Sequence, residues 1–465
     1  MDVLRLSSDF SASDRTGPLP RVIPRDQHNL SRKQISHGAL RVLYGLKDAG
    51  FRACLVGGAV RDLLLERRPK DFDVATSATP EEVRKLFRNC RLIGRRFRLA
   101  HVIFGPEIVE VATFRGTGTG GDDGNGTGDR HVVDGRILRD NVWGTIEEDA
   151  LRRDFRVNAL YYDIADFSVI DFVGGIEDLE QKRLRLIGDA ATRYREDPVR
   201  MLRAVRLAAK LGFTIDPVAE APFDALGSLL ADAPPARLFD ECQKMFLAGY
   251  GLASFRTLVR YGLMKQLFPG TARALAQDDS GALRAMIERG LAGTDTRVAD
   301  GRPVTPAFLF AVLLWGEVAT LAAKLQAEGT VRSLAWQRAA HRVMAEQGKR
   351  VAIPRRFGYA IEEIWALQPR FAERTRKRVF RLMAHPRFRA AYDFLLMRAD
   401  ESDALRESGE WWTRAQELSP DELSASLGPR PPGAPAGEAA AKPKRRRRRG
   451  GRRGKAADTR PDTQE

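Results

Sequence analysis

The first part of the chain carries its apolar residues in short runs separated by turn-forming residues. A helical pattern from about Gln34 to Leu46 precedes these runs. Short apolar runs are typical of strands, whereas the stretches between them have a helical spacing. We expect strands at Arg52–Val56, Phe72–Ala75, Arg91–Ile93, Leu99–Phe104 and Ile108–Phe114, and helices at Ala59–Glu66 and Pro80–Arg88. The pattern predicts a first domain that combines a sheet with helices, of α/β or α+β class.

The pattern changes near Lys182, after which strand-like runs almost disappear. Apolar residues then recur every three or four positions, as at Met201, Leu202 and Val205 and again through Phe308–Leu325. This is the spacing of amphipathic helices. We therefore expect the second half to be all-helical, in two packed units that end near Leu423.

A glycine-rich stretch follows the last expected strand. Gly116 to Gly128 holds seven glycines in thirteen residues, a density that neither a helix nor a central strand tolerates. No Gly-Lys-Ser/Thr sequence follows it, so it is not a P-loop, and its match to a calcium loop is incomplete. We expect a flexible connector.

Composition excludes several classes of protein. With 43% hydrophobic residues the chain can bury real cores, which excludes wholesale disorder. Three scattered cysteines, Cys54, Cys90 and Cys242, do not form a disulfide framework and suit a reducing cytoplasm. The longest apolar run, Pro306 to Trp315, is shorter than the ~20 residues of a transmembrane helix. We expect a cytoplasmic protein with no transmembrane segment.

Charge points to a polyanionic partner. The chain has 77 Lys and Arg against 61 Asp and Glu, a formal net charge of +16. Lys442 to Lys455 (KPKRRRRRGGRRGK) contains no acid and follows a linker-like stretch, Gly428 to Ala441. Guanidinium groups match phosphate oxygens and release counterions, so we expect this tail to be disordered and to bind nucleic acid. A tail that only aids solubility, or one that binds anionic lipid, is the alternative. The expected RNA-binding arginines of the tail are Arg445, Arg446, Arg447, Arg448, Arg449, Arg452 and Arg453.

The first candidate site is a turn between a strand and a helix. Gly57 and Gly58 end the expected strand and open the expected helix, and Arg61 lies near the first turn. Glycine lets backbone N–H groups approach an anion, and the helix N-terminus adds partial positive charge. We expect this turn to hold a phosphate, with Arg61 as a guanidinium fork.

A pair of acids follows this turn. Asp71 and Asp73 are two residues apart in an apparent strand, so both carboxylates project on one face, about 7 Å apart between Cα atoms. Two neighbouring acids repel each other and are stabilised by a cation. Two Mg²⁺ ions, or Mn²⁺ in their place, would suit the pair and could bridge a triphosphate. Glu110, between Val109 and Val111, is a third candidate ligand, with exposure on an edge strand as the alternative.

These residues resemble the first signature of the class II tRNA nucleotidyltransferase and bacterial poly(A) polymerase family, a branch of the DNA polymerase beta-like superfamily. Further signatures follow in the order of that family. They are RRDFRVNAL from Arg152, DFVGGIEDL from Asp171, EDPVRMLRAVR from Glu196 and RLFDE from Arg237. One residue departs from the family pattern, because Arg156 stands where a small Thr is usual.

The resemblance implies an α+β fold and specific roles. The head would be a polymerase-beta-like nucleotidyltransferase with a mixed sheet, followed by an all-α neck and body. Arg153, Asp154 and Asn158 would hold the ribose and phosphates of ATP, and Asp197, Arg200 and Arg203 would lie on the helix that reads the base. Because Asp197 and Arg200 are three apart, we expect them on one helical face, as a base reader or as an ordinary ion pair. Asp154 could instead cap a helix.

Within the family, a second strand signature favours the poly(A) polymerase branch over the CCA-adding branch. It is LIGRRFRLAHV, from Leu92 to Val102, whose Arg95 and Arg96 are expected to bind RNA phosphates. The expected activity is template-independent addition of AMP from ATP to RNA 3′ ends, with CCA addition to tRNA as the alternative. A non-catalytic RNA-binding protein is a second alternative, but RNA binding alone does not require paired acids.

The resemblance also sets the expected organisation. We expect a mobile segment at 1–33, the catalytic head at 34–180, a helical neck at 181–265, a helical body at 266–425 and a disordered Arg-rich tail at 426–465. The expected partners are the 3′ ends of mRNA, small RNA and defective tRNA, together with RNA-decay machinery. We expect a monomer.

Overall fold

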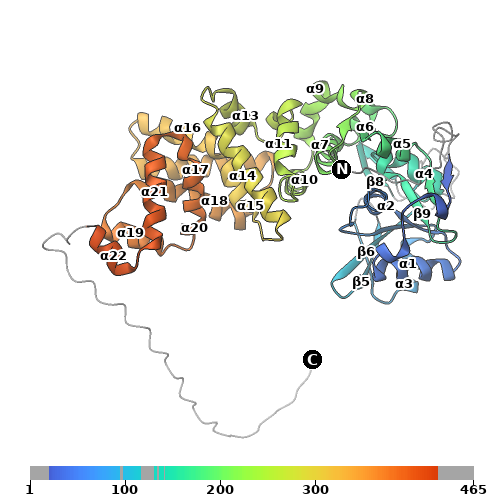
Figure 1. Cartoon of the computed structure of the whole chain (residues 1–465). Coiled ribbons are helices and arrows are strands. Elements are labelled where there is room, and N and C mark those ends of the chain that lie inside the picture. The colour runs from blue at the N-terminus through green and yellow to red at the C-terminus, as the bar shows by residue number, and fades with distance from the viewer. Residues whose placement is uncertain (1–19, 95–97, 117–129, 134–135, 141, 428–465) are drawn as a thin grey trace, which may run out of the picture.

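An eight-stranded mixed sheet forms the centre of the N-terminal part (Figure 1). The computed structural model describes residues 20–94, 98–116, 130–133, 136–140 and 142–427. The strand order is β1-β10-β9-β2-β3-β6-β5-β4, and the one parallel pair in that sheet is β3 with β6. The strands are β1 Arg21–Ile23, β2 Ala53–Val56, β3 Asp73–Thr76, β4 Cys90–Ile93, β5 Leu99–Phe104, β6 Glu107–Thr113, β9 Leu160–Asp163 and β10 Val169–Asp171. The expected α+β head with a mixed sheet is confirmed.

Helices cover both faces of this sheet. α1 and α3 pack against β5 and β6 on one face, and α4 contributes Ile146 and Ala150 to a small core with Cys54 and Tyr161 on the other. Thr79 caps α3 and Pro80 is its first residue, as expected, and Glu82 completes a capping box. The helices of the head are α1 His37–Asp48, α2 Gly58–Leu64, α3 Pro80–Leu86, α4 Ile146–Arg152 and α5 Gly175–Glu180. Two small ladders, β7 Arg130–Val133 with β8 Arg136–Asp140 and β11 Arg183–Leu184 with β12 Thr214–Ile215, lie outside the large sheet.

The second half is helical, as expected, and extends to one side of the head (Figure 1). Its first helices are α6 Ala190–Glu196, α7 Val199–Leu211, α8 Pro217–Glu220, α9 Phe223–Leu226, α10 Pro235–Phe246, α11 Gly251–Arg260 and α12 Met264–Leu267. The later helices are α13 Pro269–Ala276, α14 Ala282–Ala299, α15 Pro306–Leu313, α16 Trp315–Ala327, α17 Arg332–Arg350, α18 Arg355–Leu367, α19 Arg376–Met383, α20 Phe388–Met397, α21 Asp403–Glu417 and α22 Pro420–Ser426.

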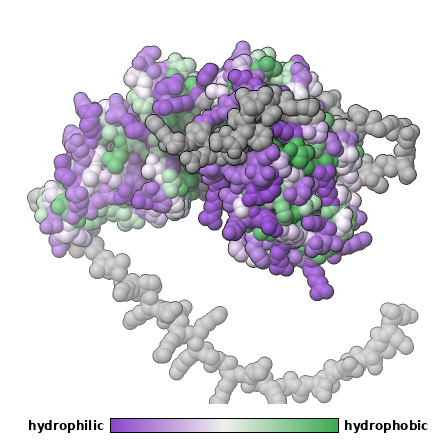
Figure 2. Space-filling model, turned by 45° about the vertical axis from the view of Figure 1, so that its right-hand side comes forward, coloured by the Kyte–Doolittle hydropathy of each residue, from purple (hydrophilic) through white to green (hydrophobic). Residues whose placement is uncertain are grey.

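One large hydrophobic cluster runs from the head through most of these helices, and a second cluster occupies the end formed by α19 to α22. Hydrophilic residues dominate the face in Figure 2, where hydrophobic residues form small scattered groups. Among the described helices no single one is long and apolar enough to cross a membrane. The helices α15 and α16, which are bent at 56° to each other, are long and apolar enough only when the two are counted together.

Several expectations about organisation differ from the structure. Arg21–Ile23, in the segment expected to be mobile, forms β1 and pairs with β10 at the edge of the sheet. Strands β9 and β10 were not expected, because every residue in them is buried and their sequences therefore lack alternation. The boundaries expected at 265/266 and 425/426 fall inside α12 and α22. Residues 1–19, the stretch after Gly116 up to 129 and the tail from 428 lie outside the described residues.

Candidate active site

The register of the sheet brings two of the predicted carboxylates side by side. Asp73 begins β3 and lies opposite Val56, the last residue of β2, while the parallel pairing sets it beside Glu110 of β6. His101 of β5 is opposite Glu110, and its Nε2 lies 3.4 Å from Glu110 Oε2. Asp71 precedes the strand and is exposed. The carboxylates of Asp73 and Glu110 therefore lie side by side on adjacent strands, and Asp73 is beside the Gly57-Gly58 turn.

The charges around Asp73 favour a divalent cation. Burial raises the pKa of Asp73 to about 6, the nearby carboxylates of Glu110 and Asp71 add to the effect, and Arg153 opposes it. Among the described residues no three His, Cys, Asp or Glu side chains are already gathered as a metal site. The donors are nevertheless the hard oxygen ligands that Mg²⁺ and Mn²⁺ prefer, and their mutual repulsion is what a bound cation would relieve. The residues present fit the expected metal.

The turn after β2 faces the same space. Gly57 has φ of 73°, in the left-handed region that favours glycine. A Cβ atom on Gly57 would lie 3.6 Å from Arg153 Nη1 and 4.0 Å from Asp73 Oδ2. Gly58 then begins α2. The structure therefore brings together the turn, the carboxylate and a guanidinium, which are the groups that a nucleotide with its metal requires.

Arg153 is held in place by two residues that the sequence did not single out. Its Nε donates to Tyr161 Oη at 2.8 Å, and its Nη2 donates to Asp149 Oδ2 at 2.9 Å. Tyr161 Oη in turn donates to Asp149 Oδ2 at 2.6 Å. Burial opposes the charge on Arg153, but Tyr161 and Asp149 outweigh it and raise the pKa of the guanidinium. The spacing of Asp149 and Arg153, four residues apart, is the one sequence signal that could have found this pair.

Arg61 is not placed as the sequence suggested. Its side chain is only 3% exposed, and it donates to Asp62 Oδ1 through Nε and Nη2, at 2.8 and 2.6 Å. Its Nη1 donates to Asn158 Oδ1 at 2.5 Å. A guanidinium with these partners is turned into a buried network and does not present an open fork to a phosphate. Arg153, which approaches Gly57, has the position that was expected of Arg61.

The same network contains three more of the predicted residues. Asn158 Nδ2 donates to Asp154 Oδ1 at 3.2 Å, and Arg203 Nε donates to Asp154 Oδ2 at 2.7 Å. Burial opposes the charge on Asp154, but Arg203 and the hydrogen bond from Asn158 hold its pKa well below the usual range. Asp154 therefore joins the head to α7, which carries Arg203. Asn158 and Arg203 thus both bond Asp154, a contact between the predicted sugar-binding and base-reading segments that the sequence did not indicate.

Replacing Asp154 with asparagine tests this support through the pH dependence of stability. Because the native pKa is depressed below the ordinary 3.8, the ionised carboxylate stabilises the fold above about pH 5 and loses this effect as the pH falls below about 4. Asp154→Asn should lower the free energy of unfolding at pH 7 by about 2 kcal/mol, since Arg203 is one-third exposed. Urea unfolding at several pH values should show that the difference in free energy of unfolding between the wild type and Asp154→Asn becomes smaller in acid. The exposed Asp48→Asn is the control, and a gap that is constant with pH would contradict the assignment.

Arg156, the departure from the family pattern, fits without distortion of the motif. A Cβ on Gly175 would lie 2.4 Å from the Arg156 carbonyl oxygen, so glycine is required there. The Arg156 guanidinium lies near Gly174, and it opposes the rise in the pKa of Asp178 to about 6 that burial causes. Arg185 Nη1 donates to Asp178 Oδ1 at 2.7 Å. Arg156, which is larger than the usual Thr, thus adds a second cation, besides Arg185, near the buried carboxyl group of Asp178.

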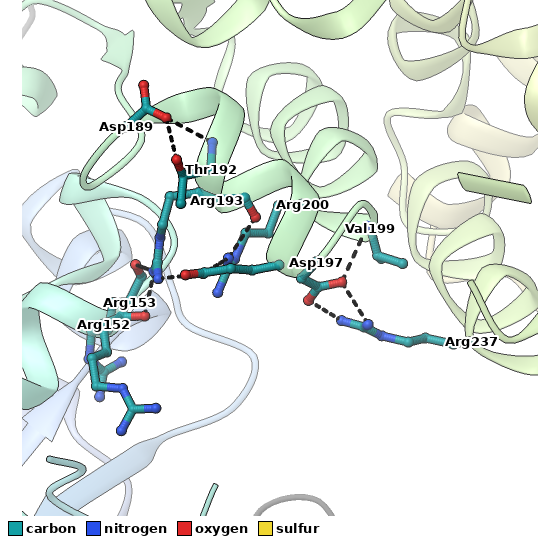
Figure 3. A network of polar contacts seen from close by, with 10 residues as sticks. Arg152, Arg153, Asp189, Thr192, Arg193, Asp197, Val199, Arg200 and Arg237 are labelled. Atoms are coloured by element: carbon teal, nitrogen blue, oxygen red, sulfur yellow. Dashed lines mark hydrogen bonds and ion pairs between the residues drawn. The ribbon is translucent and has the colours of Figure 1, made fainter. Parts of the chain in front are cut away.

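The expected base-reading pair is separated in the structure (Figure 3). Asp197 lies in the break between α6 and α7, so it does not share a helical face with Arg200, and that expectation is wrong. Asp197 accepts two hydrogen bonds from Arg237 of α10, at 2.7 and 2.6 Å. Arg200 Nη1 instead donates to Glu196 Oε2 at 2.9 Å. Pro198, between the helices, lacks the N–H that would continue α6.

Arg193 ties this region to the head. Its Nη2 donates to the carbonyl oxygens of Arg152 and Arg153, each at 2.6 Å, where α4 ends. Its Nη1 donates to Glu196 Oε2, which Arg200 also contacts (Figure 3). The residues around Asp197 are therefore fixed relative to Arg153. The sequence indicated Arg237 only as part of the RLFDE signature and did not indicate Arg193, because the partners of both lie about 40 residues away along the chain.

The predicted RNA-binding arginines cannot be placed. Arg95 and Arg96 lie outside the described residues, and so do the seven arginines of the tail. Arg98, which follows the gap, pairs with Glu81 of α3 at 2.8 Å and is half-exposed.

Comparisons with known proteins agree with this geometry. Three family models match in succession, described as the poly A polymerase head domain (residues 53–185), the probable RNA and SrmB-binding site of polymerase A (residues 212–275) and the polymerase A arginine-rich C-terminus (residues 328–453). The chain is 50% identical to poly(A) polymerase I of Escherichia coli O157:H7 over 427 residues, which are 91% of this chain and 92% of that protein. It is 45% identical to poly(A) polymerase I of Haemophilus influenzae, over 85% of this chain and 88% of that one.

CCA-adding enzymes are more distant. That of Streptococcus pneumoniae serotype 19F is 39% identical, but over 46% of this chain and 52% of that enzyme. The solved structure of the Bacillus stearothermophilus CCA-adding enzyme in complex with CTP has a TM-score of 0.54 at 25% identity, and the match covers 84% of this chain and 80% of that one. The fold is thus shared with both branches, whereas similarity over nearly the whole sequence is found with poly(A) polymerases. The chain belongs to the poly(A) polymerase family of nucleotidyltransferases.

Proposed function

We propose that the enzyme transfers AMP from ATP to the 3′ hydroxyl of RNA, without a template and repeatedly, so that a poly(A) tail grows. The observation that carries the proposal is the register that sets Asp73 beside Glu110, next to Gly57 and Arg153. The near full-length similarity to poly(A) polymerases supports adenylate over CCA addition. CCA addition to tRNA remains the second candidate, because a CCA-adding enzyme has the same fold.

The carboxylates would hold the metal. Asp71, Asp73 and Glu110 would coordinate two Mg²⁺ ions, or Mn²⁺, through oxygen atoms that now repel one another. Bound there, the ions would supply charge neutralisation at the triphosphate and lower the pKa of the attacking hydroxyl. The chain's own contribution is to gather the carboxylates around the start of β3 and to keep them close enough that a cation is needed.

The remaining side chains would position the nucleotide. The Gly57-Gly58 turn would bring backbone N–H groups to the phosphates, and Arg153, held by Asp149 and Tyr161, would direct Nη1 to them. Because no rearrangement of Arg153 is needed, its charge is already aimed where negative charge develops during transfer.

Two groups of residues have roles that differ from simple contact with ATP. The ribose side of the site would be supported by a network of Asp154, Asn158, Arg61 and Arg203, because their polar groups already bond one another. The adenine edge would meet donors and acceptors from the Asp197–Arg237 pair and from Arg200, so the choice of base would be a property of the protein.

Removal of metal tests the proposal directly. Purified enzyme with RNA and ATP in excess EDTA should show no extension, and Mg²⁺ or Mn²⁺ should restore it, because the crowded carboxylates act through the cation. Extension is read on a denaturing gel. ATP binding without metal should be weakened but measurable, since Arg153 and the glycine turn remain. Extension that persists in EDTA would contradict the metal assignment.

The setting follows from the reaction. We place the enzyme in the cytoplasm, where bacterial mRNA, small RNA and defective tRNA offer 3′ ends, and where RNA-decay machinery could use the added tails. Free thiols at Cys54, Cys90 and Cys242 are compatible with a reducing compartment. We expect it to act as a monomer.

A further inference from the structure

A groove lies in the helical part, away from the candidate active site. It has a volume of about 920 Å³ and is bounded by α17, α18, the short 3₁₀ helix η6 (Gln368–Ala372) and α19. A cavity of about 450 Å³ adjoins it, and both are lined by Arg332, Trp336 and Pro369. The combined space is far larger than one ion requires and is continuous along the faces of several helices.

The charge of this groove is suited to an anion. Arg332, Arg370 and Arg381 line it, and among the described residues none of the three has an acidic partner. Three glutamates also line the groove. Glu373 pairs with Arg378 at 3.1 Å and Glu363 with Arg387 at 3.2 Å, so Glu362 is the acid that remains to offset these arginines. Unpaired guanidinium forks along a groove are the usual ligands for successive phosphates.

Aromatic side chains interleave with these arginines. Tyr359 is 67% exposed on the groove wall, an unusual exposure for so large a ring. Trp336 lies where the two cavities meet, and its indole stacks on Trp315 with centroids 5.1 Å apart and planes 14° apart. The Arg398 guanidinium lies 4.2 Å from the centre of the Trp315 ring. Trp336 is thus backed by a rigid stack and fixed in orientation.

We propose that this groove binds single-stranded RNA, upstream of the 3′ end that reacts in the head, an inference that rests on the proposed transfer of AMP to RNA. Bases would stack on Tyr359 and Trp336, and Arg332, Arg370 and Arg381 would bind the phosphates between them. Alternation of aromatic faces with guanidinium groups is the way proteins hold single strands without reading their sequence. That tolerance suits an enzyme whose product has a growing tail. A free phosphate ion would not need the exposed ring, and an acidic protein segment would not need a stacking platform.

The test uses the full chain and a fluorescent oligoadenylate of about 30 nucleotides. Binding is measured by anisotropy at several salt concentrations. Arg332→Gln, Arg370→Gln and Arg381→Gln together should lower the slope of log affinity against log salt by about 2, since each single-strand phosphate contact contributes about 0.7. Tyr359→Ala should weaken binding by about fivefold to a hundredfold, and Tyr359→Phe, which keeps the stacking face, should bind as the wild type does.

Controls separate a local site from general charge. Arg302, Arg389 and Arg406 are similarly exposed but have acidic partners, so their glutamine variants should leave the salt slope nearly unchanged. Extension of a primer of about five nucleotides should keep its wild-type rate in every variant, because such a primer cannot reach both the head and the groove. Thermal unfolding should be unaltered by Tyr359→Ala, since the ring is exposed.

Three results would overturn the proposal. Wild-type affinity and slope in the arginine variant would exclude phosphate binding here. Weaker RNA binding by the triple arginine variant, together with wild-type RNA binding by Tyr359→Ala, would indicate general electrostatic attraction and not a stacked strand. If these variants kept their RNA affinity but no longer bound a protein partner of the enzyme, the groove would be assigned to that partner.

Discussion

Asp73→Ala should reduce nucleotidyl transfer by at least about a thousandfold. Asp73 is the most buried of the three proposed metal-binding carboxylates, and it lies between Glu110 and the Gly57 turn. Several kcal/mol of charge stabilisation depend on the metal, and each 1.4 kcal/mol is a factor of ten in rate. Single-nucleotide extension with labelled RNA in saturating ATP and Mg²⁺ measures the effect. We expect Glu110→Gln to lower the rate as well, but less, because its side chain is 43% exposed.

The fold should survive this change. The pKa of Asp73 is raised from 3.8 to about 6, so in the absence of metal its ionisation costs stability that builds up between these two pH values and is fully present at pH 7. Removing the carboxylate should therefore leave the midpoint of thermal unfolding at pH 7 unchanged or slightly higher in EDTA. The matched control is Asp48→Ala at the exposed end of α1, which should retain full activity. Near wild-type transfer by folded Asp73→Ala would remove Asp73 from the metal site.

Arg237→Gln should relax the preference for ATP by about tenfold to a hundredfold. Arg237 makes both of its hydrogen bonds to Asp197 and, with the Val199 N–H, fixes the Asp197 carboxylate in the break between α6 and α7. A bidentate contact to a base edge is worth about 1–3 kcal/mol of discrimination, and it requires a fixed carboxylate. Asp197→Ala should have the same effect. The measurement is kcat/KM for ATP and for CTP on one RNA primer.

A positioning role predicts how the kinetic constants divide. Arg237→Gln should raise the KM for ATP and improve the relative use of CTP, whereas a purely structural defect would lower the rates for both nucleotides equally. Arg195→Gln is the control, because Arg195 is exposed on α6 and lies two residues from Asp197. Unchanged selectivity in both Arg237→Gln and Asp197→Ala would show that the base is read elsewhere.

The sequence predicted the parts of the site that depend on local pattern. The β2–Gly-Gly–α2 turn, β3 with Asp73, β6 with Glu110 and the capped α3 are all where alternation and capping residues indicated. These features depend on periodicity and on neighbours within a few residues. The parallel pairing of β3 with β6, which joins Asp73 to Glu110, is a tertiary contact that neither strand's own sequence contains.

The errors arise where distant segments decide the outcome. Arg61 has the residue type and position of a phosphate ligand, but Asp62 and Asn158 draw its guanidinium into the interior. Asp197 and Arg200 have helical spacing, yet Asp197 lies in the break between α6 and α7. Its carboxylate instead accepts hydrogen bonds from Arg237, 40 residues away. A composition rich in Pro and Ser concealed β1, because an edge strand needs only the hydrogen bonds of its neighbour β10.

One assay tests most directly whether this chain is an adenylate-specific, template-independent RNA polymerase. Purified enzyme should be incubated with Mg²⁺, a short RNA and each of the four nucleoside triphosphates in turn, and in parallel with a tRNA that lacks its 3′ CCA. We expect a long ladder with ATP and little extension with GTP, CTP or UTP on either RNA. Addition of C, C and A to the tRNA followed by arrest, with no ladder from ATP alone, would contradict it.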